Sequence, residues 1–205
     1  MLFLLKILRA TAFPTLTLRL IIVDKFETRV FGAWVLKSAA FQDSRGSFSR
    51  LFCSRELQEI IGSRMIAQIN HSATHNIGAV RGLHYQNPPH TEMKIVRCLK
   101  GRVFDVAVDL RKGSPTYLEW TAVELTPENH FAFVIPEGCA HGFQVLEKDS
   151  ELLYLHTAFY TPHAEGAIRF DDPRIQVDWP MPPTDISERD LSHPYLQEDF
   201  KGVVL

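Results

Sequence analysis

The strongest constraint on the fold lies in residues 94–111, KIVRCLKGRVFDVAVDLR, where two apolar runs meet at a Lys-Gly pair. In the second run large apolar residues alternate with Asp, Ala and Asp. A period of two sends alternate side chains to opposite faces of a strand, so the segment predicts two antiparallel strands joined by a tight turn at Lys100-Gly101. One face of the second strand belongs to a core, and the other is partly polar.

Similar short runs, punctuated by Gly, Pro, Asn and Asp, continue from about Val30 and predict an antiparallel sandwich or barrel. One short helix is predicted over Ser54–Ile61, capped by Ser54. From Thr161 onward, frequent Pro and Asp predict loops and turns. The further strand candidates are Trp120–Leu125, Phe131–Ile135, Gly142–Leu146 and Leu152–Thr157.

Size and charge exclude several classes of protein. The 205 residues favour one domain with room for an arm, and 45% hydrophobic residues predict a sizeable core. A formal net charge of −2 argues against a nucleic-acid-binding protein. Three widely spaced cysteines, Cys53, Cys98 and Cys139, predict free thiols and a cytoplasmic location.

The apolar first residues, MLFLLKILRATAFPTLTLRLIIV, are interrupted by Lys6, Arg9 and Arg19. The cations lie within the apolar run instead of preceding it, which is unlike a signal peptide, and no run reaches the ~18 apolar residues of a membrane span. We therefore expect no membrane association, and the role of residues 1–20 stays open.

The polar residues of the predicted strands are of the kinds found in a pocket. Strands that face water usually carry Lys, Glu and Thr, whereas histidines, aspartates and a tyrosine among aromatic residues are typical of a cavity wall. The residues concerned are His84, Lys94, Asp105, Asp109, Tyr154 and His156.

A Pro-x-Gly-x-x-His motif at Pro136, Gly138 and His141 is similar to the second motif of the cupin jelly roll. Metal-binding cupins also need a His-x-His pair in their first motif, and here Gln86 occupies the position two after His84. With one imidazole missing, we predict that no metal is bound. A metal-dependent cupin oxygenase or isomerase is kept as an alternative.

Several long motifs, spread in order from about residue 26 to 197, resemble the dTDP-4-dehydrorhamnose 3,5-epimerase family. They are FQDSRGSF (41–48), QINHS (68–72), RGLHYQ (81–86), KIVRCLKGRVFDVAVDLRKGSPT (94–116), IPEGCAHGF (135–143) and IQVDWP (175–180).

The resemblance implies an all-β fold, a double-stranded β-helix or cupin-like jelly roll with a few short helices, over residues 26–205. Residues 1–25 are then an N-terminal arm. The resemblance also implies a homodimer that exchanges N-terminal strands, and the apolar segment Leu18–Val23 could add to a partner's sheet. The implied reaction uses no cofactor and acts on a dTDP-linked 4-keto-6-deoxy sugar.

The chemistry of such a reaction can be reasoned from the substrate. A ketone at C4 acidifies the hydrogens at C3 and C5, so inversion needs a base, an acid on the opposite face and a group that stabilises the enolate oxygen. Imidazole is the natural base near neutral pH, and His84 is the candidate. By resemblance, Asp190 orients this imidazole, Tyr154 is the acid, and Lys94 stabilises the enolate.

By the same resemblance, Arg45 and Arg81 bind the diphosphate, for which a planar guanidinium is well suited. Phe41, Gln68 and Asn70 line the thymine site, and His141 is a further substrate-binding residue.

Three residues depart from the family's pattern. Leu155 replaces the usual Lys, Phe159 replaces a Tyr, and Glu92 replaces a frequent Gln. None of these changes removes the base, the acid or the cation, but they could alter substrate choice. Two alternatives to double inversion therefore stay open: a C3-only epimerase, and an inactive sugar-nucleotide-binding module on the same fold.

Overall fold

The computed structural model describes residues 23–205. Most of the expected arm, including all but the last residue of Leu18–Val23, lies outside the described residues. Strand β1 (Val23–Glu27) begins three residues before the expected start of the domain at residue 26 and pairs with β2 of the same chain.

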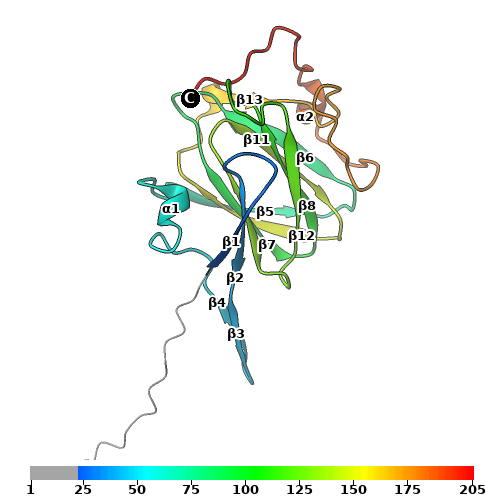
Figure 1. Ribbon diagram of the computed structural model, residues 1–205. Helices are drawn as coiled ribbons and strands as arrows, with labels where there is room; N and C mark the ends of the chain where they lie inside the picture. The colour runs from blue at the N-terminus through cyan, green and yellow to red at the C-terminus, as the bar shows by residue number, and fades with distance from the viewer. Residues whose placement is uncertain (1–22) are drawn as a thin grey trace, which may run out of the picture.

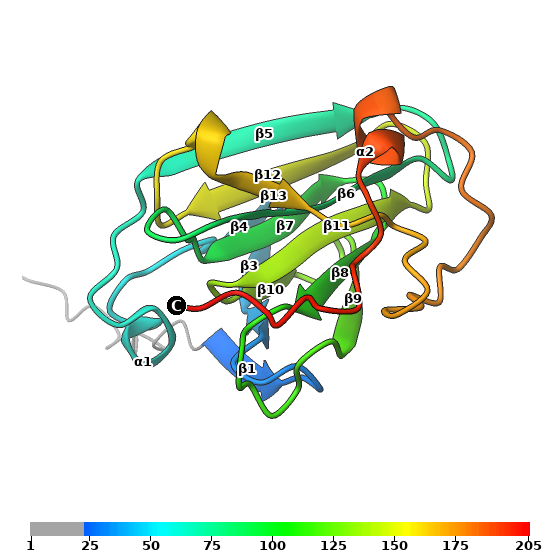
Figure 2. The ribbon, with the colours of Figure 1, turned by 90° about the horizontal axis from the view of Figure 1, so that it is seen from above.

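Two antiparallel sheets face each other and form the body of the molecule (Figures 1 and 2). The six-stranded sheet has the order β1, β2 (Trp34–Ser38), β10 (Phe131–Ile135), β7 (Lys94–Lys100), β12 (Ser150–His156) and β5 (Gln68–Thr74). The five-stranded sheet has the order β13 (Glu165–Ala167), β6 (Val80–Gln86), β11 (Cys139–Val145), β8 (Val103–Asp109) and β9 (Trp120–Leu125). This architecture confirms the all-β jelly roll.

The segment 94–111 that carried the fold prediction forms two strands, as expected, but the strands do not pair with each other. It forms β7 and β8, and Gly101 at the turn has a φ of 75°, a conformation that glycine adopts without steric cost. The two strands lie in different sheets, so the Lys-Gly turn joins the two layers instead of closing a hairpin within one sheet. The alternation along β8 sends Val103 and Ala107 into the core between the sheets, and Val106 and Val108 toward the opposite face.

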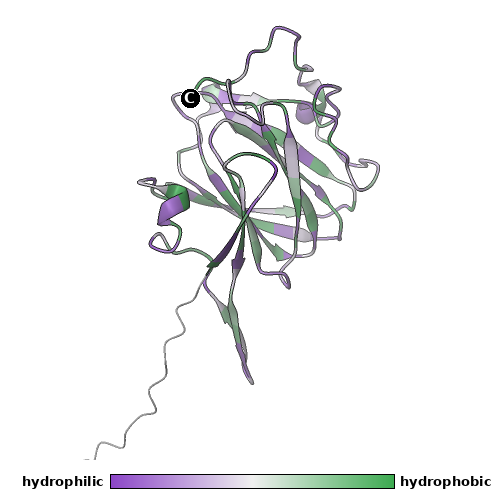
Figure 3. Cartoon of the chain, viewed as in Figure 1, coloured by the Kyte–Doolittle hydropathy of each residue, from purple (hydrophilic) through white to green (hydrophobic). Residues whose placement is uncertain are grey.

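The outer faces of both sheets are covered by other parts of the chain. Helix α1 (Gln58–Ile61) packs Leu57 and Ile61 against the six-stranded sheet, and residues from the C-terminal segment cover the five-stranded sheet. Hydrophobic and hydrophilic residues are mixed along the strands of both sheets (Figure 3).

The prediction for the first helix was wrong in its extent. The helix begins only at Gln58, after residue Leu57 at its N-cap, and no side chain caps it. Residues 54–57 form turns instead, with the Leu57 amide bonded to the Cys53 carbonyl at 3.1 Å. Burial of Leu57 and Ile61 is sufficient to fix this segment without a cap at Ser54.

The remaining elements are short. A hairpin of β3 (Ala40–Asp43) and β4 (Gly46–Ser49) projects away from the body, and its aromatic side chains are exposed (Figure 1). A 3-10 helix covers Pro162–Ala164, and helix α2 covers Glu188–Ser192. In the part of the chain that the structure describes, no helix is long and apolar enough to cross a membrane.

Candidate active site

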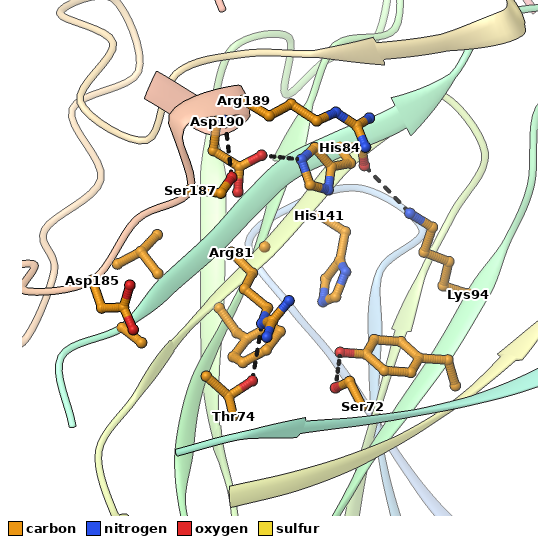
Figure 4. Close-up of a pocket in the computed structure, with 15 residues that line it drawn as sticks. Ser72, Thr74, Arg81, His84, Lys94, His141, Asp185, Ser187, Arg189 and Asp190 are labelled. Carbon is orange, nitrogen blue, oxygen red and sulfur yellow. Dashed lines mark hydrogen bonds and ion pairs between the residues drawn. The ribbon is translucent and has the colours of Figure 1, made fainter. Parts of the chain in front are cut away.

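A cavity of about 430 Å³ opens between the two sheets (Figure 4). It gathers six of the residues that the sequence singled out, together with several that it did not. The predicted residues are Arg81, His84, Lys94, His141, Tyr154 and Asp190, and the additional polar ones are Ser72, Thr74, Asp185, Ser187 and Arg189.

His84 and Asp190 form a hydrogen-bonded pair at the edge of this cavity. The Nε2 atom of His84 lies 2.8 Å from Oδ1 of Asp190. Both residues line the cavity, where the side chain of His84 is 29% exposed and that of Asp190 is 6% exposed. A carboxylate in this position fixes the ring orientation and stabilises a protonated imidazole.

Helix α2 delivers Asp190 to this place. Ser187 is the N-cap, and its hydroxyl accepts the amide hydrogen of Asp190 at 3.1 Å. The second carboxylate oxygen accepts the Gly82 amide at 3.3 Å. Burial alone would raise the pKa of Asp190, but the hydrogen bond and charge of His84, with the Gly82 amide, outweigh it and lower that pKa. Asp190 is therefore held as a carboxylate.

An irregularity between β6 and β11 brings Arg81 and His84 to the same cavity. Residues three apart in a regular strand face opposite sides, yet both line the pocket. The register shifts between the pairs His141–His84 and Phe143–Arg81. Gly82 lies at this shift with a φ of 115°, and a Cβ there would fall 2.6 Å from the Cα of Gly142. Two facing glycines thus permit the close approach of the two backbones.

The opposite wall of the cavity carries Lys94 and Tyr154. They come from β7 and β12 of the six-stranded sheet, whereas His84 comes from the other sheet. The Tyr154 hydroxyl lies 3.0 Å from Oγ of Ser72, and burial raises the pKa of Tyr154 well above its usual range. The phenol therefore keeps its proton until a stronger base forms nearby.

A second imidazole–carboxylate pair, His141 with Asp105, lies next to the first. Nε2 of His141 is 2.8 Å from Oδ1 of Asp105, and both side chains are buried. His141 is the register partner of His84 across the two strands. The sequence placed Asp105 on a cavity wall, but its pairing with His141 was missed.

The expected nucleotide-binding residues divide into two groups. Gln68 and Asn70 are on strand β5 but are not among the residues that line the cavity. Nδ2 of Asn70 lies 3.3 Å from Nε2 of His156, and Oε1 of Gln68 accepts the Tyr160 amide at 2.8 Å. Phe41 and Arg45 instead lie on the projecting hairpin, and Arg45 pairs with Asp43 of the same hairpin. Within one chain the structure does not bring these two residues to the cavity.

Among residues 23–205, one group could hold a metal ion. His84, Asp190 and His193 have ligand atoms that all lie within 4.8 Å of one another. Two of these residues already form the hydrogen bond described above, so a metal there would compete with that bond.

These features define a class of protein. Two sheets enclose a cavity that bears an oriented imidazole on one wall and a neutral phenol and an ammonium on the other. That arrangement suits removal and return of a proton on opposite faces of a small anionic substrate.

Comparison with known proteins identifies the family. The sequence profile of the family described as dTDP-4-dehydrorhamnose 3,5-epimerase matches residues 27–198. A dTDP-4-dehydrorhamnose 3,5-epimerase of Sinorhizobium fredii is 41% identical over 80% of this chain and 85% of its own length. The chain belongs to the dTDP-4-dehydrorhamnose 3,5-epimerase family.

Two solved structures extend the comparison. A dTDP-6-deoxy-D-glucose-3,5-epimerase from Legionella pneumophila, in complex with dTDP-4-keto-L-rhamnose, has a TM-score of 0.80 at 36% identity, covering 84% of this chain and 92% of its own. A 3'-monoepimerase from Streptomyces bikiniensis, in complex with dTDP-quinovose, has a TM-score of 0.76 at 31% identity, covering 82% and 85%.

Proposed function

We propose that this protein inverts C3 and C5 of dTDP-4-dehydro-6-deoxyglucose and so forms dTDP-4-dehydro-L-rhamnose. The observation that carries the proposal is the placement of the His84–Asp190 pair across one cavity from Lys94 and Tyr154. A base and an acid on opposite walls can act on opposite faces of the same carbon, which is what inversion requires.

Each inversion is a pair of proton transfers. His84 removes the hydrogen from C3 or C5, and the electrons of the C–H bond move through the new C=C bond onto the C4 oxygen. Lys94 stabilises the enolate oxygen, and Asp190 stabilises the imidazolium. Tyr154 then delivers a proton to the other face of the carbon as the C4 ketone re-forms. His84 releases its proton to solvent and the phenolate regains one before the next carbon reacts.

The substrate is held by residues from both chains of a homodimer in this proposal. Arg81, His141, Gln68 and Asn70 belong to the chain that contains the cavity. Phe41 and Arg45 of a projecting hairpin reach the cavity of the second chain, and N-terminal strands are exchanged between the two. Light scattering at micromolar concentration should give the mass of a dimer, and a monomer would contradict this assembly.

The assembly can also be tested through the active sites. An Arg45→Ala chain mixed with an inactive His84→Ala chain should recover part of the activity, because half of the mixed dimers' sites then combine an intact hairpin with an intact base. Recovery would be absent if each chain used its own hairpin.

The proposed reaction needs no cofactor and no metal, and we place the protein in the cytoplasm. Turnover should be unchanged after dialysis against a chelator, with zinc, iron and manganese in the dialysed protein measured by elemental analysis. Loss of turnover on chelation, restored by one of these metals, would instead support the metal-dependent cupin.

The decisive experiment is incubation with dTDP-4-dehydro-6-deoxyglucose in heavy water. Deuterium should enter at both C3 and C5, as read by NMR. Deuterium at C3 alone would identify a C3-only epimerase, the second candidate, which the similarity to a 3'-monoepimerase favours. Substrate binding without any label would identify an inactive binding module.

Tyr154→Phe is the matched variant for this experiment because it removes one hydroxyl and keeps the ring. Exchange at the first carbon should continue, whereas delivery of the proton to the opposite face should slow by about 10²-fold. Full inversion by this variant would exclude Tyr154 as the acid.

A further inference from the structure

Glu92 and His156 form a buried pair next to Lys94, and the His156 ring is stacked against the ring of Tyr154 with centroids 6.0 Å apart. Oε2 of Glu92 lies 2.8 Å from Nδ1 of His156, and the two side chains are 8% and 11% exposed. Neither residue lines the cavity. Any effect of this pair on the reaction would therefore pass through a residue that lines the cavity.

The residue that it contacts is Lys94. The other oxygen of Glu92, Oε1, lies 3.2 Å from Nζ of Lys94. His156 and Lys94 are also register partners on the neighbouring strands β12 and β7. The carboxylate therefore uses one oxygen for the ammonium and the other for the imidazole, and both contacts together fix its orientation.

One arrangement of hydrogens satisfies this network. Burial would raise the pKa of Glu92, but the hydrogen bond from His156 and the charge of Lys94 outweigh it and lower that pKa. A carboxylate only accepts, so Nδ1 of His156 donates to Glu92. Nε2 of His156 is then free to accept from Nδ2 of Asn70, which lies 3.3 Å away.

The ammonium of Lys94 has three hydrogens, and the surrounding atoms account for two of them. One is donated to the backbone carbonyl of His84 at 3.3 Å, and one lies toward Glu92. Among the described residues, Glu92 is the one carboxylate within 4 Å of this ammonium. The third hydrogen is available to the cavity, on the side where the enolate oxygen would develop.

We propose that Glu92, braced by His156, is a positioning residue that aims the Lys94 ammonium at the C4 oxygen of the substrate. The inference rests on the proposed epimerase function and deepens it. A charge that is already oriented before reaction stabilises the developing enolate without reorganisation, so the benefit falls on the transition state and not on substrate binding.

The direct test is Glu92→Gln. The amide keeps the shape of the carboxylate but removes its charge: its oxygen can still accept from Lys94, and its NH2 can donate to Nδ1 of His156 in the other tautomer. The variant, which restores a residue frequent in the family, therefore removes the attraction that holds the ammonium. We expect kcat to fall about 10-fold because the ammonium is held less firmly, with KM and the Kd for dTDP unchanged. Wild-type kcat in this variant would overturn the proposal.

A double-mutant cycle with Lys94→Met separates positioning from a general structural role. If Glu92 acts through Lys94, Glu92→Gln should cost nothing further once Lys94 is Met. Effects that multiply would overturn the proposal. The double variant also removes both buried charges, so it provides a folded protein for comparison even if the single variant has a lowered Tm or loses dTDP binding.

His156 offers a second, graded test. His156→Ala should lower kcat in the same direction as Glu92→Gln, and His156→Asn should recover part of the loss because its amide can donate to Glu92 in place of Nδ1. Equal losses in both His156 variants would contradict the bracing role.

Glu56→Gln is the control, because Glu56 is a largely buried carboxylate paired with Arg50 outside the cavity. Glu56→Gln should leave kcat unchanged. A loss equal to that of Glu92→Gln would show that removing any buried carboxylate lowers kcat, and this would contradict the positioning role of Glu92. Wild-type protein that takes up no deuterium would refute the proposed function. An active wild type with an equally active Glu92→Gln would refute the positioning role alone.

Discussion

The two imidazole–carboxylate pairs of the cavity have the same geometry and different surroundings. In each pair a histidine Nε2 lies 2.8 Å from an aspartate Oδ1, and the two histidines are register partners on adjacent strands. The second oxygen of Asp190 accepts the Gly82 amide, whereas Oδ2 of Asp105 is buried with no partner among the described residues.

These surroundings shift the two carboxyl groups in opposite directions. The pKa of Asp190 is lowered, and that of Asp105 is raised because burial outweighs the attraction of His141 and Lys94. A carboxylate that keeps its charge stabilises an imidazolium, and one that is costly to ionise does so less well. The comparison teaches that equal contact distances do not make the two pairs equivalent. The deeper burial of Asp105 and the lack of a partner, within residues 23–205, for its second oxygen distinguish it from Asp190.

The largest effect should come from the base itself. His84→Ala should lower kcat about 10²- to 10⁴-fold, the usual contribution of a general base, with the Kd for dTDP nearly unchanged. NMR in heavy water should show no deuterium uptake at C3 or C5 in this variant. Calorimetry should show that it still binds dTDP. If His84→Ala exchanged deuterium at the wild-type rate, His84 would not be the base. The proposed difference between the two imidazole–carboxylate pairs would then also be wrong.

Removal of the charge behind the base should have a smaller effect. Asp190→Asn should lower kcat about 10- to 100-fold, because the amide retains the shape but stabilises the imidazolium less well. In the His84→Ala background it should add almost nothing, since the two groups act as one unit. Effects that multiply would show that Asp190 acts by another route.

Substitution in the second pair, His141 with Asp105, should change KM more than kcat. His141→Ala should raise KM about 10-fold and lower kcat less, because His141 is expected to bind the substrate and not to transfer its proton. Steady-state kinetics with the same substrate distinguish the two outcomes. A fall in kcat as large as that of His84→Ala, with KM unchanged, would make the two pairs equivalent.

The smallest effect is on stability as a function of pH. A lowered folded pKa means that Asp190 adds stability above about pH 4, which is lost as the pH falls through the folded pKa. A raised folded pKa means that Asp105 contributes less as the pH rises above about 4.

Thermal unfolding between about pH 3 and pH 6 measures this difference. The Tm of the wild type relative to Asp190→Asn should rise with pH, and its Tm relative to Asp105→Asn should fall with pH. Slopes of the same sign would contradict the opposite shifts of the two carboxyl groups.

Much of the fold followed from the sequence because strands with one buried face repeat every second residue. The alternation in 103–109 and the Lys100-Gly101 turn predicted β7 and β8 correctly. The pattern did not show that the two strands lie in different sheets. A tight turn can have the same sequence whether it connects two paired strands of one sheet or two strands in facing sheets. The extent of helix α1 was also missed, since burial and not a cap determines where it begins.

The site was predictable only in part. The residues on regular strands, such as Lys94 and Tyr154, came from the motifs and the polar face. That Arg81 and His84 share one cavity depends on the register shift at Gly82, and alternation predicts the opposite. The link from Glu92 through His156 to Asn70 joins a loop and two strands, so no local pattern could reveal it.

Helix α2 also places the carboxylate of the His84–Asp190 pair late in the order of synthesis. Asp190 comes 106 residues after His84, and all the strands of the two sheets are complete by Ala167. A ribosome can therefore have released every strand while the base still lacks its carboxylate. A chain cut before Asp190 would keep the scaffold with an unassisted imidazole, and by the prediction for Asp190→Asn its activity would be reduced.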